Sequence, residues 1–213
     1  MWNNKFKVKA DYEWQAFSSL NPLRKWWKQE LLKKVLTLAD GYGDTAVLVI
    51  GCGSSPLITH FSDAVGIDMD PGKIEFMKRK APRHKFLVMD ARDLKFEDNR
   101  FDLIFCLEVI EHIRECDKVM SEIRRVLRSR GKLIISTPDN GKILWRVIQL
   151  FYNRLAPYGL DHISLFTFDE LLALGGRYGL ELETKEYVAS CDLVVRFRQT
   201  VGYNWGWRGK GEE

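Results

Sequence analysis

A glycine turn and three carboxylates stand out in this 213-residue sequence as groups that could bind a nucleoside. The turn is Gly51-Cys52-Gly53, and the carboxylates belong to Asp68, Asp90 and Glu108. Glycine lets the backbone approach a ligand closely. A carboxylate can accept hydrogen bonds from ribose hydroxyls or from the exocyclic amine of a base. Because each group follows an apolar run, the order predicts a nucleoside site along one edge of a sheet.

The residues after the turn distinguish between classes of nucleotide. A dinucleotide-binding fingerprint requires glycine at the position of Pro56, because that glycine permits close packing of helix against strand. A nicotinamide-dependent dehydrogenase is therefore disfavoured. Pro56 instead suits the first position of a short helix that Ser54 or Ser55 caps. Taken alone, the G-x-G pattern is equally compatible with a tight turn that binds no ligand. The acidic residues at the strand ends favour a nucleoside site over that alternative.

Five short apolar runs would position these groups. The runs cover 46–50, 64–67, 86–89, 101–107 and 132–136. They are bounded by turn residues and apolar on both faces, which is typical of parallel strands covered on both sides. Helical patterns at 72–80 and 115–128 alternate with them. The alternation predicts an α/β fold with a doubly wound, Rossmann-like, mainly parallel sheet.

The first and last parts of the sequence follow other patterns. Residues 12–39 read as an N-terminal helical arm that Asn21-Pro22 interrupts. A helical pattern covers 168–178, and the runs 181–189 and 193–200 then alternate apolar and polar residues. This period of two predicts a terminal antiparallel hairpin, which would complete a sheet of seven strands.

The composition fits a globular domain. Hydrophobic residues make up 46% and charged residues 29%, which excludes a disordered chain. The net charge of +4 permits an anionic partner without demanding one. The four cysteines are far apart and form no C-x-x-C pair, which argues against a zinc ribbon and a disulfide framework. No secretory signal and no apolar run of membrane-spanning length are visible, so we expect a cytoplasmic protein without a transmembrane segment.

The ordered set of motifs resembles the class I S-adenosylmethionine-dependent methyltransferases, in particular the small-molecule branch (ubiquinone-type, methyltransferase type 11-like). The likeness covers about 46–187 and rests on VLVIGCGSSP, GIDMDP, VMDARDLKFEDNRFDLIFCLEVIEHI, EIRRVLRSRGKLIISTP and HISLFTFDELL. It implies one methyltransferase domain over 1–213, with an N-terminal helical arm at 1–40, an α/β core at 46–200 and a lid at about 139–165. It also implies S-adenosylmethionine as cofactor and methyl transfer to an oxygen or nitrogen of a small or lipid-like acceptor.

Carried over by position, the resemblance implies a set of cofactor-binding residues. Asp68 would hold the ribose diol, Asp90 would accept from the adenine amine, and Tyr12 of the arm would close over the cofactor. The full set is Tyr12, Gly51, Cys52, Gly53, Asp68, Met69, Asp90, Ala91, Leu107 and Glu108. The sequence departs from the family pattern at two positions. Val49 stands where the family usually has an acidic residue, and Ser55 stands at the third glycine.

A second group of side chains could handle a proton or a metal ion. Glu108, Glu111 and His112 are spaced i, i+3, i+4, so they share one face if a helix begins at Glu108. With His162, this E-x-x-E-H pattern resembles the divalent-metal site of some ubiquinone-pathway O-methyltransferases and small-RNA 2′-O-methyltransferases. The alternatives are a histidine base and a structural role for the Glu-His pair. We therefore take Glu111, His112 and His162 as candidate catalytic residues and leave the metal unassigned.

Two further segments could face the acceptor. Residues 20–38 are rich in Lys, Arg and Trp and could bind phosphate or a membrane surface, although a solvated helix whose Trp and Leu pack on the sheet is the favoured interpretation. Residues 143–152 are strongly apolar and could form either a lid that admits a greasy acceptor or a plain core helix.

Rival functions remain open at this point. They are an RNA methyltransferase and a non-catalytic S-adenosylmethionine-binding partner protein. The sequence does not indicate the oligomeric state.

Overall fold

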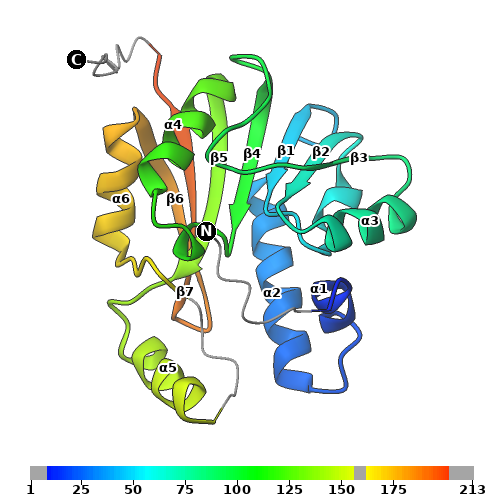
Figure 1. Ribbon diagram of the computed structural model, residues 1–213. Helices are drawn as coiled ribbons and strands as arrows, with labels where there is room; N and C mark the ends of the chain where they lie inside the picture. Colours follow the sequence, from blue (N-terminus) through cyan, green and yellow to red (C-terminus); the bar gives the residue numbers. More distant parts are fainter. Residues whose placement is uncertain (1–8, 156–161, 202–213) are drawn as a thin grey trace, which may run out of the picture.

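A seven-stranded sheet forms the centre of the computed structural model, which describes residues 9–155 and 162–201 (Figure 1). The strand order is β3-β2-β1-β4-β5-β7-β6. β1 to β5 run parallel, and β7 pairs antiparallel with both β5 and β6. The strands are β1 (Ala46–Ile50), β2 (Asp63–Asp68), β3 (Lys85–Val88), β4 (Phe101–Leu107), β5 (Leu127–Pro138), β6 (Leu180–Val188) and β7 (Asp192–Gln199). The predicted doubly wound sheet and its antiparallel hairpin are confirmed.

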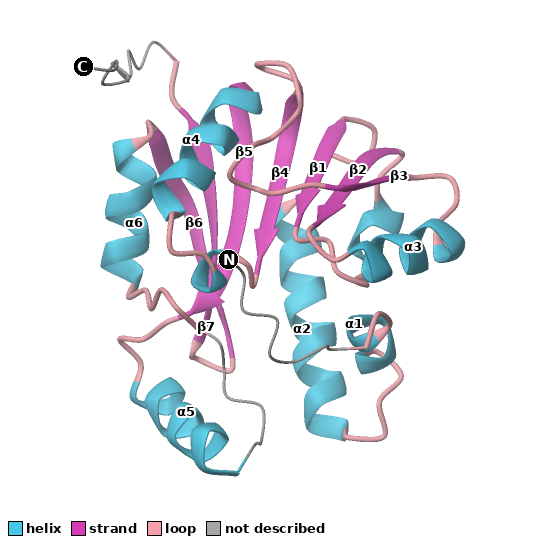
Figure 2. Cartoon of the chain, in the orientation of Figure 1, coloured by secondary structure: helices cyan, strands magenta, loops and turns pink. Residues whose placement is uncertain are grey.

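Helices flank the sheet, and α5 lies beyond the end at which β1 and β4 terminate (Figure 2). The helical elements are α1 (Tyr12–Ala16), α2 (Pro22–Leu38), η1 (Pro56–His60), α3 (Pro71–Lys80), η2 (Ile110–His112), α4 (Cys116–Val126), α5 (Ile143–Leu155) and α6 (Phe168–Arg177). Within the described ranges, no helix is both long and apolar enough to cross a membrane.

Two apolar cores lie on opposite faces of the sheet. In β1, Leu48 and Ile50 face one core, to which α4 and α6 contribute. Val47 and Val49 face the other core, to which α2, α3 and η1 contribute. Both faces of β1 are therefore buried, and this is why its sequence is apolar at every position.

Local signals set the starts of the helices. Asn21 accepts hydrogen bonds from the backbone N–H groups of Leu23 and Arg24, and Pro22 occupies the first turn, so α2 begins after the predicted interruption. Asp70 caps α3 in the same way. Thr167 and Glu170 form a capping box at the start of α6.

One predicted helix has other bounds, and the condition for the shared face of Glu108, Glu111 and His112 is not met. The helix predicted for 115–128 ends at Val126, because Leu127 pairs with Phe101 and begins β5. No helix begins at Glu108, whose backbone has a φ of +54° and is followed only by the three-residue η2. The predicted lid at 139–165 is described in part, since 156–161 lie outside the described residues.

Candidate functional site: the carboxyl edge of the sheet

The glycine turn joins β1 to η1 at the point where the strand order reverses. The chain passes from β1 to β2 on one side and later returns to β4 on the other, which creates the crevice where open α/β sheets bind ligands. Gly51 and Gly53 have φ values of +61° and +51°, a conformation that favours glycine. The Cys52 side chain is buried in the core, so only its backbone is available to a ligand.

The short helix after the turn agrees with the sequence prediction. Pro56 is its first residue, and the Ser55 side chain accepts a hydrogen bond from the Leu57 N–H at 3.3 Å. The helix spans only five residues.

Asp68 ends β2 directly beside the turn. Its Oδ2 accepts a hydrogen bond from the Gly53 N–H at 2.9 Å, and its Oδ1 accepts from the Asp70 N–H at 2.8 Å. The side chain of the neighbouring Met69 is 41% exposed. The prediction that the turn and this carboxylate lie together is thus correct, while their roles toward a ligand stay predictions.

Asp90 lies beyond β3 and is engaged by a neighbour that the sequence analysis missed. The Arg92 guanidinium donates to both carboxylate oxygens of Asp90, at 2.6 Å for the closest pair, and reaches Glu115 at 2.5 Å. The hydrogen bonds from Arg92 lower the pKa of Asp90. Asp90 is therefore an ionised acceptor whose orientation Arg92 fixes, and Ala91 beside it is buried.

Glu108, which follows β4, and Asp192, which begins β7, form a pair of carboxyl groups. Glu108 Oε1 accepts from the Ser136 hydroxyl at 2.7 Å, and Asp192 Oδ2 accepts from the Trp27 indole N–H at 3.1 Å. Asp192 is 1% exposed, and burial followed by repulsion from Glu108 raises its pKa. Leu107, before Glu108, packs at the margin of the second core. The sequence did not single out Asp192, because a polar residue at the start of a strand carries no signal of a functional site.

We expect Asp192→Asn to change how stability depends on pH. An unfolded Asp ionises near pH 3.9, whereas the folded Asp192 keeps its proton to higher pH. The wild type therefore loses unfolding free energy as pH rises above about 4 toward the folded pKa, by up to about 1.4 kcal/mol per pH unit. The substituted amide has no such charge and still offers an oxygen to Trp27. Urea unfolding should show that the free energy of unfolding of the variant, relative to that of the wild type, is higher at neutral pH than at acid pH. If the two proteins depend on pH in parallel, the pKa of Asp192 is not raised.

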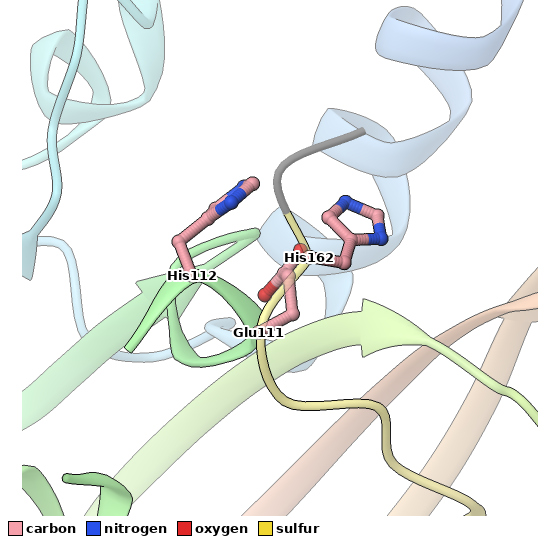
Figure 3. A group of neighbouring side chains, drawn as sticks. All are labelled: Glu111, His112 and His162. Atoms are coloured by element: carbon pink, nitrogen blue, oxygen red, sulfur yellow. The ribbon is translucent and has the colours of Figure 1, made fainter. Parts of the chain in front are cut away.

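Glu111, His112 and His162 converge from two separate segments (Figure 3). One candidate ligand atom from each lies within 4.8 Å of the others. The Ile163 and Ser164 N–H groups donate to the Glu111 carbonyl at 2.8 and 2.9 Å, which holds the second segment against η2. The predicted catalytic residues are thus brought together. Glu108 is not part of this cluster, since its carboxylate turns toward Ser136.

The electrostatics of this cluster favour the neutral forms of Glu111 and His162. Glu111 is 1% exposed, and among the described residues neither of its carboxylate oxygens has a hydrogen-bond partner of normal geometry. Burial followed by the Glu108 charge raises the pKa of Glu111. Burial followed by repulsion from His112 lowers the pKa of His162 to about 4. The ring centroids of these two histidines are 5.0 Å apart, and Trp145 of α5 stacks on His162 at 5.7 Å. The cluster could hold a divalent ion or, without one, accept hydrogen bonds from an acceptor molecule.

The arm reaches the turn through Glu13, which the sequence analysis missed. Glu13 Oε2 accepts hydrogen bonds from the Ser54 N–H at 3.1 Å and the Ser54 hydroxyl at 2.5 Å. The Glu13 N–H donates to that hydroxyl oxygen at 3.0 Å, and Lys73 pairs with Glu13 Oε1 at 3.3 Å. Burial opposes ionisation, but Lys73 and Ser54 outweigh it and lower the pKa of Glu13. Tyr12 directly precedes Glu13, so the contact between Glu13 and Ser54 also fixes the position of Tyr12. The Tyr12 ring centroid lies 4.0 Å from the guanidinium carbon of Arg24.

We expect Glu13→Gln to loosen the arm. The variant keeps the shape but loses the ion pair and one acceptor, so the free energy of unfolding should fall by about 1 kcal/mol. Hydrogen exchange at the amides of Glu13 and Trp14, both of which donate to Ser54 Oγ, should accelerate. Glu75→Gln is the control, because Glu75 pairs with Arg79 on the exposed surface of α3. Equal effects of the two substitutions would refute the docking role.

Comparison with known proteins shows that the chain is similar to methyltransferases. Residues 48–135 match the family model described as "Methyltransferase domain". The chain is 33% identical over 122 residues to a demethylmenaquinone methyltransferase from Thermotoga maritima, with 56% of this chain and 51% of the relative covered. It is 24% identical over 171 residues to a ubiquinone biosynthesis O-methyltransferase from Histophilus somni, with 72% and 68% covered. The chain thus spans about half the length of the first of these relatives.

A solved structure extends the likeness to the fold. The magnesium protoporphyrin IX methyltransferase from Synechocystis, solved with bound SAH, superposes with a TM-score of 0.69 at 15% identity, covering 88% of this chain and 93% of that one. The sheet order, the glycine turn and the matched family model all agree with a methyltransferase domain. Residues 48–135 therefore match a methyltransferase domain, and the described residues have the fold of a solved methyltransferase.

Proposed function

We propose that this chain binds S-adenosylmethionine at the carboxyl edge of the sheet and transfers its methyl group to an oxygen or nitrogen of a small or lipid-like acceptor. The hydrogen bond of 2.9 Å between the Gly53 N–H and Asp68 carries the proposal, because it joins the turn and the ribose-type carboxylate at the reversal of strand order. In this proposal the whole of 1–213 acts as one domain, with the arm at 1–40 and the lid at about 139–165.

The residues at this edge fit the cofactor chemically. The backbone of Gly51 and Gly53 leaves room for the methionine part, and Asp68 suits the ribose hydroxyls. Asp90 suits the adenine amine. The remaining proposed contacts are Tyr12, Cys52 through its backbone, Met69, Ala91, Leu107 and Glu108.

The chain's own task is to position the acceptor and receive its proton. The bound cofactor supplies an electrophilic sulfonium methyl, so alignment alone can contribute about 7–11 kcal/mol. A base with a pKa of about 4 matches a neutral working pH poorly. We therefore assign His162 to orienting the acceptor by a hydrogen bond and His112 to receiving the proton. Glu111 holds the two segments together through its backbone carbonyl, which accepts from the Ile163 and Ser164 N–H groups.

The relatives and α5 both support the proposed acceptor class. The names of both curated relatives refer to quinone methylation. Trp145 of α5 is buried and stacks on His162, so the apolar helix α5 lies beside the candidate catalytic cluster. Both observations support an apolar ring or a lipid-like acceptor. A cytoplasmic location belongs to the same proposal, and cell fractionation tests it.

The decisive experiment combines calorimetry with a transfer assay. We expect purified protein to bind S-adenosylhomocysteine, and labelled S-adenosylmethionine to yield one labelled small-molecule or lipid product in host extract. Binding without transfer to any extract component would instead assign a non-catalytic cofactor-binding partner. Label in RNA, together with tRNA binding of steep salt dependence, would assign an RNA methyltransferase. Absence of any affinity for either cofactor form would refute the proposal.

Chelation tests the metal interpretation of the Glu111–His112–His162 cluster. Burial raises the pKa of Glu111, which favours the protonated carboxyl, and a protonated carboxyl is a poor metal ligand. We therefore expect turnover to be unchanged after EDTA treatment. Loss of activity that Mg²⁺, Mn²⁺ or Zn²⁺ restores would identify the cluster as a metal centre instead.

A further inference from the structure

Exposed apolar side chains are unevenly distributed over this chain. Among the described residues, thirteen large hydrophobic side chains are exposed, and seven of them lie in just two short segments. Three belong to the approach to α2 and its first turns, and four belong to α5. They are Leu20, Leu23, Trp26, Ile143, Leu144, Val147 and Leu150. We call these two segments, 20–29 and 140–150, the apolar rim.

The rim lies at one end of the molecule. The first turns of α2 and the whole of α5 extend past the end of the sheet where β1 and β4 terminate (Figure 1). This is also the end at which the proposed cofactor site opens. Trp145 anchors α5 by stacking on His162, while Ile143, Val147 and Leu150 recur at i, i+4 and i+7 and point outward as one exposed face.

The charges of the rim have one sign. Residues 20–29 contain three basic side chains, residues 140–150 contain two, and neither segment contains an acidic one. The five are Arg24, Lys25, Lys28, Lys142 and Arg146. The chain as a whole has 33 basic and 29 acidic residues, so the acid-free rim differs from the average composition of the chain. Within the described part of the chain, none of the five forms an ion pair.

We infer that the apolar rim docks on the surface of an anionic lipid bilayer. Apolar side chains flanked by Lys and Arg are the combination that inserts at the headgroup boundary, because the basic residues are attracted to an anionic surface. A nucleic acid would engage the basic residues but would leave Ile143 and Leu150 in water. A second copy of the chain would bring its own positive rim against this one.

Vesicle co-sedimentation of the full chain tests the inference without cofactor or acceptor, so its result is independent of methyl transfer. We expect the wild type to pellet with vesicles of phosphatidylcholine and phosphatidylglycerol and to remain in solution with phosphatidylcholine alone. Raising the salt concentration should weaken the binding, because the charge attraction is screened.

Variants distinguish vesicle binding through the apolar rim from non-specific adsorption. Ile143→Glu/Leu150→Glu should lower vesicle affinity by about tenfold or more, since two apolar contacts are lost and two negative charges face the anionic surface. Val201→Glu is the matched control, because Val201 is 65% exposed, close to the 70% of Leu150, but follows β7 beside the opposite end of β5. It should bind as the wild type does. Lys25→Gln/Arg146→Gln should also weaken binding while leaving the apolar face intact.

Circular dichroism of each variant establishes that it is folded. No pelleting of the wild type with anionic vesicles, or equal pelleting of the Ile143/Leu150 variant and the Val201 control, would overturn the inference. So would a concentration-dependent dimer that Ile143→Glu/Leu150→Glu abolishes while vesicles do not bind. RNA binding that depends on Lys25 and Arg146 but not on Leu150, without vesicle binding, would overturn it in favour of a nucleic-acid surface.

Discussion

Asp68→Asn should weaken the binding of S-adenosylhomocysteine by about a hundredfold. The wild-type carboxylate accepts hydrogen bonds from the Gly53 and Asp70 N–H groups and, in the proposed function, from ribose hydroxyls. An asparagine offers one oxygen and turns its NH₂ group toward the second donor. A hydrogen bond to a charged group contributes about 1.5–3 kcal/mol, and about 2.7 kcal/mol corresponds to about a hundredfold in affinity. Isothermal titration calorimetry measures the loss directly.

The matched control for this substitution lies in the same strand. Asp63 is the first residue of β2 and is exposed, at the opposite end of the strand from Asp68. Asp63→Asn removes the same charge from the protein, so net charge cannot explain a difference between the two variants. If Asp68→Asn binds S-adenosylhomocysteine as tightly as Asp63→Asn does, Asp68 does not hold the cofactor.

Gly51→Ala should lower the free energy of unfolding by about 2–5 kcal/mol. The Gly51 backbone has a φ of +61°, which costs a residue with a side chain about 1–2 kcal/mol. A Cβ at this position would also overlap the Cγ2 atom of Val109, and overpacking of this kind costs about 1–3 kcal/mol. Urea unfolding measures the sum, and cofactor affinity should fall with it because the turn must move.

A second substitution separates the two causes. In Gly51→Ala/Val109→Ala the overlap is relieved while the backbone strain persists, so a double-mutant cycle should show a favourable coupling of about 1 kcal/mol or more. Gly43→Ala is the control for the loss of glycine, since nothing lies within 4 Å of a Cβ there and its φ is not positive. Equal stability of Gly51→Ala and Gly43→Ala would contradict the packing that the turn requires.

The features predictable from the sequence were those with a local signal. β1 and β4 have the predicted bounds, because runs apolar on both faces of a strand carry their own evidence of burial. Pro56 and Ser55 start η1 as expected, because capping depends on neighbours in sequence. The proximity of Asp68 to the glycine turn followed from the rule that parallel strands end at one edge.

What the sequence did not disclose depends on contacts between distant segments. Glu13 meets Ser54 across 41 positions, and Trp27 meets Asp192 across 165, so neither pair has a period or spacing to detect. The absence of a helix at Glu108 has a similar origin. Glu108 has a positive φ and forms backbone and side-chain hydrogen bonds to Ser136. These contacts with β5 prevent the helix that the spacing of Glu108, Glu111 and His112 would allow.

The place of β7 in the sheet has a consequence for synthesis of the chain. β7 lies between β5 and β6 although it follows both in sequence. On the ribosome, β5 emerges with one side unpaired, and β6 has no neighbour until Asp192–Gln199 has left the exit tunnel. Until then the nascent polypeptide exposes an apolar strand edge of the kind that chaperones protect and that otherwise pairs with other chains. A pause in translation before this strand would therefore prolong the period in which the nascent protein is prone to aggregate.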